Sequence, residues 1–157
     1  MARYNKIFAA LDGGETQEAV VRRALSIAHD NNSEVLFGYV IDVTRFATAG
    51  VGEEDLEETN KRLLREKLER YLARSEKDEC IPSVELQVKS GSVDEVLIHE
   101  FIKSFEPDLV ICGVRGLSDF KYALVGSVST NLVRHANCDV LVVRPEAIED
   151  VDLSEYE

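Results

Sequence analysis

The feature that most constrains the fold is a regular alternation between short apolar runs and longer segments with helical spacing. The short runs have the length and apolar content of buried strands: Ile7–Leu11, Val35–Val43, Val84–Val88, Leu109–Cys112 and Val140–Val143. The longer segments repeat apolar residues every three or four positions: 16–31, 53–76, 92–105 and 127–136. Strands that alternate with helices form parallel sheets with right-handed crossovers. The sequence therefore predicts an α/β fold, with a five-stranded parallel sheet and helices on both faces.

The ends and the apolar faces of the helices can be predicted in the same way. We expect the first helix to start at Thr16, or at Gly14 just before it, and to stop at Asn31-Asn32. Ser92 and Glu95 have the spacing of a capping box at the start of the third helix. The side chains expected to face the core are Val20, Ala24, Ile27 and Ala28, then Leu56, Leu63, Leu64, Leu68, Tyr71 and Leu72, then Val93, Val96, Leu97, Phe101 and Phe105, and last Val128, Leu132 and Val133.

The length of the chain indicates how many domains it forms, and its net charge excludes some classes of partner. A chain of 157 residues without a Pro/Gly linker suits one domain. Its formal charge of −12 argues against nucleic acid and anionic membrane as partners, because both require clustered Lys and Arg. Half of this charge lies in residues 146–157, which contain six acidic residues and no basic one. We therefore expect one domain over residues 1–145 and an acidic C-terminal tail over residues 146–157.

The compartment is predicted from what the sequence lacks. No apolar run reaches the roughly 18 residues that a membrane span requires, and the first apolar run is too short for a secretory signal. The sequence has three cysteines, Cys80, Cys112 and Cys138. Their odd number and the absence of CxxC spacing indicate neither a disulfide framework nor a zinc knuckle. We expect a cytoplasmic protein.

The most informative stretch for function follows the fourth predicted strand. Gly113 and Gly116 allow a sharp turn and a close approach of the backbone to a ligand. Gly126-Ser127 open the next predicted helix, whose free N–H groups favour an anion. These features together could cradle a phosphate, although the spacing alone leaves open that the glycines only shape a loop. The sequence contains no Gly-Lys dipeptide, so the cradle has no P-loop lysine.

The spacing Gly113-x2-Gly116-x9-Gly126-Ser127 is similar to the signature of the universal stress protein family, in its nucleotide-binding branch. The run Ile7–Gly13 resembles the first strand of that family and its terminal Asp, and the run His135–Pro145 resembles its closing strand. The resemblance covers about residues 4–145. It implies the strand order 3-2-1-4-5 of the adenine nucleotide alpha hydrolase-like fold, with a ligand crevice between the first and fourth strands.

By position, the resemblance also implies the ligand contacts. Asp12 is expected to meet the adenosine part, where a carboxylate can accept hydrogen bonds from ribose hydroxyls or from the adenine amine. The Val40 backbone is expected to contact the adenine edge, and the glycines with Ser127 are expected to contact ribose and phosphates. The complete candidate set is Asp12, Val40, Gly113, Arg115, Gly116, Gly126, Ser127, Val128 and Ser129. The implied cofactor is ATP or another adenine nucleotide, with Mg²⁺ strengthening its binding if Asp119 faces the phosphates.

Other polar residues give weaker signals. Arg115 and Lys121 could neutralise phosphate, or they could be solvated surface charges. Cys112 is expected to be a buried core thiol, with a redox-sensitive lid on the site as the alternative. Each of the three histidines, His29, His99 and His135, lies alone on a predicted helix. We expect structural or surface roles for them. No serine lies in a nucleophile elbow and no carboxylate pair suggests an acid–base couple, so we predict neither catalytic residues nor a metal site.

These observations predict a regulatory protein of universal stress type, in which an adenine nucleotide orders the loop 116–126 and changes what the protein contacts. The alternatives are a slow ATPase and a nucleotide-free dimeric interaction protein. We expect a homodimer through the apolar edge strand Val140–Val143, with Asp139 of one chain near Arg144 of the other. The alternative cover for this edge is the acidic tail. A protein partner is also expected, but the sequence does not identify it.

Overall fold

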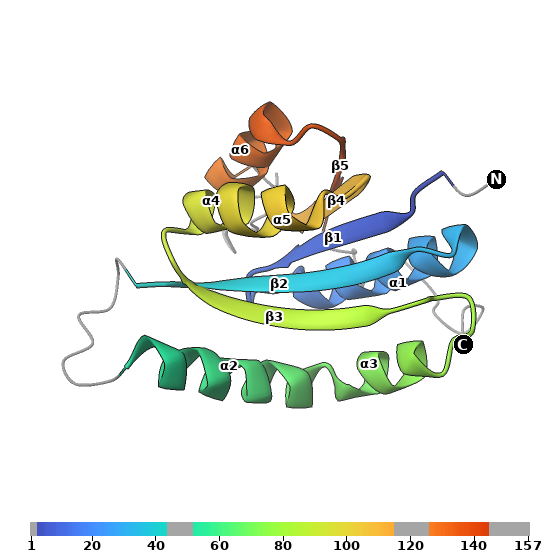
Figure 1. Ribbon diagram of the computed structural model, residues 1–157, viewed down its shortest axis with the longest axis horizontal. Helices are drawn as coiled ribbons and strands as arrows, with labels where there is room; N and C mark the ends of the chain where they lie inside the picture. The colour runs from blue at the N-terminus through green and yellow to red at the C-terminus, as the bar shows by residue number, and fades with distance from the viewer. Residues whose placement is uncertain (1–2, 44–51, 115–125, 145–157) are drawn as a thin grey trace.

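The computed structural model describes residues 3–43, 52–114 and 126–144, which form a five-stranded parallel sheet with helices on both faces (Figure 1). The strands lie in the order β3-β2-β1-β4-β5. The predicted fold class and strand order are therefore confirmed. The strand bounds are β1 (Lys6–Leu11), β2 (Glu34–Asp42), β3 (Val84–Gly91), β4 (Leu109–Gly113) and β5 (Asp139–Val143).

The helices form one layer on each side of the sheet. One face is covered by α1 (Gln17–Asn31), α2 (Glu53–Lys67) and α3 (Glu69–Glu76). The other is covered by α4 (Val93–Glu95), the π-helical segment η1 (Val96–Ile102), α5 (Lys103–Phe105) and α6 (Ser127–His135) (Figure 1). Within the described residues, none of these helices combines the length and the apolar composition that a membrane crossing requires.

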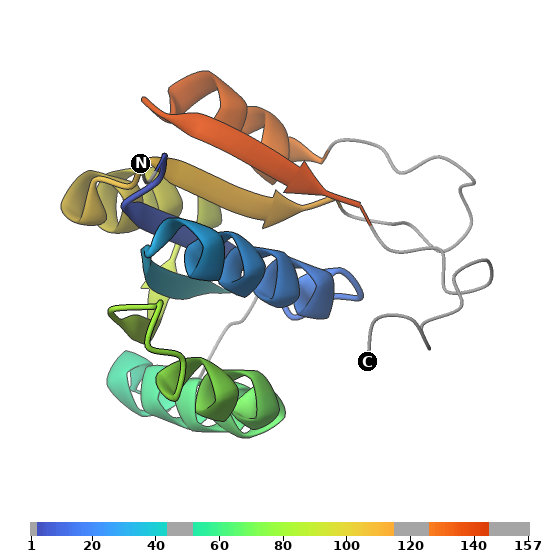
Figure 2. The ribbon, with the colours of Figure 1, turned by 90° about the vertical axis from the view of Figure 1, so that its right-hand side faces the viewer.

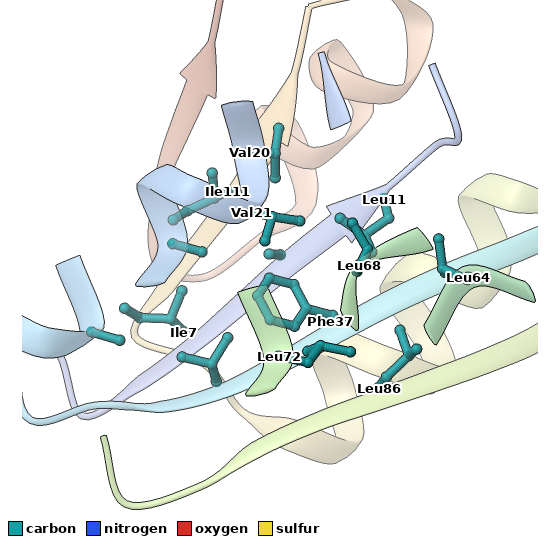
Figure 3. Close-up of a cluster of buried hydrophobic side chains, with 14 of the residues drawn as sticks. Ile7, Leu11, Val20, Val21, Phe37, Leu64, Leu68, Leu72, Leu86 and Ile111 are labelled. Atoms are coloured by element: carbon teal, nitrogen blue, oxygen red, sulfur yellow. The ribbon is translucent and has the colours of Figure 1, made fainter. Parts of the chain in front are cut away.

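The central strands are buried on both faces, because alternate side chains point into two separate cores. In β1, Ile7 and Ala9 belong to the core under α1, α2 and α3, whereas Phe8 and Ala10 belong to the core under η1 and α6. Figure 3 shows the first core, in which Phe37 of β2 lies among side chains of α1 and α3. Continuous apolar runs are what strands covered on both faces require.

Gly38 in the middle of β2 is explained by the second core. A Cβ atom at this position would lie 2.6 Å from Cε2 of Phe8 and 3.2 Å from Cε2 of Phe101. These two rings stack with their centroids 5.3 Å apart. The missing side chain of Gly38 therefore leaves the space in which the two rings hold η1 against the sheet.

The second predicted helix is interrupted. It divides into α2 and α3 at Leu68, whose φ of −101° and ψ of 7° lie outside the helical range. The hydrogen bonds from Leu68 N–H to Leu64 O and from Leu72 N–H to Leu68 O persist, both at 3.0 Å. The distortion is thus local, and all three leucines stay buried in one core. No Pro or Gly marks the break in the sequence, and Leu63, predicted to face the core, is 53% exposed.

The third and fourth predicted helices are present, with three corrections. The segment 93–105 is π-helical in its middle, where the N–H of Lys103 bonds to the carbonyl of Ile98, five residues earlier. The predicted capping box is wrong, because the Ser92 side chain makes no capping hydrogen bond and lines a cavity instead. In α6, Leu132 is buried as predicted, but Val133 is 58% exposed.

Candidate functional site

A cavity of about 320 Å³ lies at the carboxyl ends of the strands. In a sheet of this order, β1 has its sequence neighbour β2 on one side and β4 on the other, which makes the gap between β1 and β4 the topological switch point. The volume is within the range of small-molecule sites. The cavity is lined by Ala10–Asp12, Tyr39, Val40, Asp42, Ser92–Asp94, Leu97, Cys112, Gly113 and Gly126–Ser129.

Asp12 directly follows β1, in a turn that fixes its carboxylate. Its Oδ1 accepts a hydrogen bond from the N–H of Gly14 at 2.8 Å, so Oδ2 is not used in this turn. Gly13 has a φ of +75°, which favours glycine, and its N–H donates to Oε1 of the buried Gln17 at 2.7 Å. The turn thus holds an exposed carboxylate at the rim of the cavity.

The first turn of α6 forms the opposite wall. Gly126 is the N-cap, and the hydrogen bond from Thr130 N–H to Gly126 O, at 3.1 Å, closes the first turn of the helix. The N–H groups of Ser127, Val128 and Ser129 precede this bond and so have no carbonyl partner within the helix. Together with the helix dipole, these donors suit an anion.

Ser129 connects α6 to β4. Its side chain is buried, and Oγ donates to the carbonyl of Gly113 at 3.4 Å while accepting from the Cys112 thiol at 3.7 Å. The hydroxyl is therefore engaged within the protein. Of the donors that Ser129 could offer a ligand, the backbone N–H is the one that remains.

Packing requires a glycine at position 113, which the sequence did not reveal. A Cβ atom at this position would lie 2.5 Å from Oγ1 and 2.9 Å from Cβ of Thr16. Thr16 is the N-cap of α1, but its hydroxyl makes no capping bond and donates instead to the carbonyl of Val114 at 3.3 Å. Glycine at 113 thus allows the start of α1 to pack on β4. This packing requirement adds to the expectation that the glycine allows a ligand to approach, which stays a prediction.

Charge is unevenly distributed around the cavity. The side formed by the ends of β1 and β2 and by the start of α4 carries Asp12, Asp42 and Asp94. The side formed by α6 offers backbone N–H groups. Among the described lining residues there is neither Lys nor Arg. The cavity therefore has an acidic end and an anion-binding end.

Most of the predicted site residues meet in this cavity. Seven of the nine line it: Asp12, Val40, Gly113, Gly126, Ser127, Val128 and Ser129. Arg115 and Gly116 lie outside the described residues, as do Asp119 and Lys121. The sequence analysis missed Tyr39, Asp42, Ser92 and Asp94. Their position near or just after the ends of two predicted strands was the available signal, because the carboxyl ends of parallel strands share one edge of the sheet.

The environment of Cys112 fits a core thiol. The residue is 3% exposed. Burial raises the pKa of the Cys112 thiol, which keeps it protonated at neutral pH. A reactive cysteine needs an accessible thiolate. The alternative of a redox-sensitive lid is thus disfavoured.

Comparison with known proteins assigns the family. The model of the universal stress protein family matches residues 3–144. The chain belongs to the universal stress protein family. A relative from Staphylococcus haemolyticus that is named as a universal stress protein is 30% identical over 150 residues, which cover 96% of this chain and 90% of the relative.

Solved universal stress proteins have the same fold. UspA from Lactobacillus plantarum superposes with a TM-score of 0.75 at 22% sequence identity, covering 92% of this chain and all of the other. A universal stress protein crystallised in complex with cAMP superposes with a TM-score of 0.64, also at 22% identity, covering 92% of this chain and 99% of the other. These likenesses establish the universal stress protein fold around the cavity.

Proposed function

We propose that this universal stress protein binds an adenine nucleotide in the switch-point cavity, with the phosphates at the N-terminus of α6. The observation that carries the proposal is that a single cavity joins Asp12, Val40 and the first turn of α6. These segments are far apart in the sequence and carry the residues that the family signature selects. The cAMP complex of a protein with the same fold supports an adenine nucleotide as the ligand.

The charge distribution sets the orientation of the nucleotide. Phosphates would be repelled by Asp12, Asp42 and Asp94, whereas the N–H groups of α6 attract them. The ribose hydroxyls and the adenine amine are hydrogen-bond donors, which carboxylates can accept. The apolar side chains of Val40 and Leu97, both buried, provide a surface for the flat purine ring. Adenosine thus lies toward β2 and α4, and the phosphates toward α6.

We infer that the role of the site is regulatory rather than catalytic. Phosphoryl transfer requires positive groups that stabilise the charge of the transition state. The described lining provides carboxylates and backbone N–H groups, a set that can hold a nucleotide without accelerating its hydrolysis. Slow ATP hydrolysis is the alternative, and a phosphate-release assay on the nucleotide-bound protein distinguishes the two.

Titration calorimetry with ATP tests the binding site directly. In Gly126→Val, the φ of −72° at the N-cap is one that valine adopts without strain, so the fold should persist. The branched side chain would fill space beside the N–H groups of the first turn of α6 and should weaken ATP binding at least tenfold. Gly52→Val is the matched control, because Gly52 is the N-cap of α2 with a φ of −65° and lies outside the cavity. Equal ATP affinity of the two folded variants would contradict the proposal.

Edge strand β5 supports a second element of the proposal, a homodimer through Val140–Val143. In the described sheet β5 pairs with β4 only, and Figure 2 shows it at the outer edge. Val140, Leu141 and Val142 are half-buried, and pairing with a second copy would cover them. Oδ2 of Asp139 accepts a hydrogen bond from the Tyr4 hydroxyl at 2.8 Å, and the carboxylate keeps further acceptor sites for Arg144 of a second chain.

A further inference from the structure

Three side chains with metal-binding atoms meet at the end of the sheet opposite the nucleotide cavity. His29 lies in the last turn of α1, and Asp78 and Cys80 lie in the turn between α3 and β3. Nδ1 of His29 is 2.7 Å from Oδ2 of Asp78. The ligand atoms of all three residues lie within 4.8 Å of one another. Figure 1 shows the α3–β3 turn at the same end of the molecule as the end of α1.

The turn between α3 and β3 is held in place independently of His29. Asp78 N–H donates to Ser75 O, and Ile81 N–H donates to Asp78 O, both at 3.1 Å. Oδ1 of Asp78 accepts from the N–H of Cys80 at 2.9 Å, which leaves Oδ2 directed at His29. Ile81 is 7% exposed and anchors the turn in the core. The Asp78 side chain and the backbone of Cys80 are thus held in place before a metal binds.

We propose that His29, Asp78 and Cys80 bind a zinc ion, with water as the fourth ligand. Imidazole, thiolate and carboxylate are the donors that Zn²⁺ uses, whereas Mg²⁺ and Ca²⁺ prefer oxygen ligands alone. In a tetrahedral site, metal–ligand bonds of about 2.0–2.3 Å separate neighbouring ligand atoms by about 3.3–3.7 Å. The 2.7 Å between Nδ1 of His29 and Oδ2 of Asp78 is shorter than this range and the 4.8 Å limit of the set is longer, so the ligand atoms must shift by up to about 1 Å when the metal binds. The His29 side chain, which is 54% exposed, is free to make the remaining adjustment.

The charges of the site balance when zinc binds. The Cys80 thiol releases its proton to solvent, and Asp78 is already a carboxylate. Two negative ligands and one neutral imidazole then neutralise the two positive charges of Zn²⁺. The hydrogen bond between His29 and Asp78 is replaced by two bonds to the metal, so zinc would link the end of α1 to the α3–β3 turn.

This site is separate from the nucleotide cavity. His29 and Thr16, at opposite ends of α1, are about 20 Å apart at the helical rise of about 1.5 Å per residue. The zinc proposal therefore does not depend on nucleotide binding. Bound zinc would stabilise the folded state by joining two segments that are distant in the sequence.

Competition for Zn²⁺ between the metal-free protein and a chromogenic chelator tests the proposal. We expect one Zn²⁺ per chain, and at least tenfold weaker binding in each of His29→Gln, Asp78→Asn and Cys80→Ser. The matched controls are His135→Gln and Cys138→Ser, which change an exposed histidine and another free cysteine outside the cluster and should leave the affinity unchanged. Urea unfolding in the presence of chelator verifies that every variant is folded.

Cobalt provides a readout that is specific for the thiolate. Co²⁺ bound at this site should give a thiolate charge-transfer absorption in wild type and in Cys138→Ser, and none in Cys80→Ser. Zinc should also raise the melting temperature of wild type but not that of His29→Gln. A wild-type protein that binds no zinc, or a charge-transfer absorption that persists in Cys80→Ser, would overturn the proposal and leave His29 and Asp78 as an ion pair only.

Discussion

Replacing Gly113 with alanine tests the packing role of this glycine. The new Cβ would lie 2.5 Å from Oγ1 and 2.9 Å from Cβ of Thr16, and 3.3 Å from Cγ2 of Val20. The Cβ of Thr16 is fixed to the backbone, so no side-chain rotation relieves the second contact. Overpacking of a core costs about 1–3 kcal/mol. Because two contacts are shorter than 3.0 Å, we expect Gly113→Ala to lose about 2–3 kcal/mol of unfolding free energy.

A second substitution tests the cause of this loss. Thr16→Gly removes both clashing atoms and keeps an acceptable N-cap residue. Alone it should cost about 1–2 kcal/mol, because the bond to Val114 O is lost and the unfolded chain gains freedom. The double variant should lose less unfolding free energy than the sum of the two single losses, by about 1–2 kcal/mol. The assay is urea unfolding of the four proteins without nucleotide. Additive costs, or an unchanged stability of Gly113→Ala, would refute the packing argument.

Three further predictions concern other parts of the chain. The hydrogen bond between His29 and Asp78 raises the pKa of His29 above 6.5 and lowers the pKa of Asp78 below 3.8, so the pair stabilises the fold most between these values. Urea unfolding in the presence of chelator should show that His29→Gln loses more unfolding free energy, relative to wild type, at about pH 5.5 than at about pH 8.5. The reason is that the stabilisation by the His29–Asp78 pair is lost as pH rises through the raised pKa of His29. Equal losses at the two pH values would contradict this. Because Cys112 is buried whereas Cys80 and Cys138 are half-buried, mass spectrometry should find the Cys112 thiol alkylated only after unfolding and the other two cysteines alkylated earlier; equal rates in the native state would be inconsistent with the core role. Deleting residues 146–157 should leave a dimer by light scattering, whereas a monomeric full-length protein that aggregates on truncation would show that the tail covers β5.

The sequence predicted the fold well because its signals are local and repeated. Alternation of apolar runs with helical spacing defined the five strands and their helical connections, and the Asn31-Asn32 stop is confirmed by the left-handed conformation of Asn32. The break at Leu68 and the π-helical segment were not predictable in this way. They depend on how the helices fit the sheet, and neither contains a Pro or Gly that would mark it.

The candidate site was predictable where a motif existed and not where contacts are purely spatial. The glycine spacing and the acid after the first strand selected residues that line one cavity. Asp42 and Asp94 carry no motif, and the packing of Gly113 on Thr16 joins residues that no sequence pattern relates. For His29 the sequence predicts a structural or surface role but not its partner, because the contact with Asp78 spans 49 residues.

The most direct test of the proposed function is the response of individual backbone amides to nucleotide in two-dimensional NMR spectra. Adenosine should shift the amide signals around Val40 and Asp12, because the nucleoside lies toward β2. ATP should shift these signals and, in addition, those of Ser127, Val128 and Ser129, whose N–H groups receive the phosphates. ATP shifts that leave the α6 amides unchanged, or that lie only outside the cavity, would contradict the account.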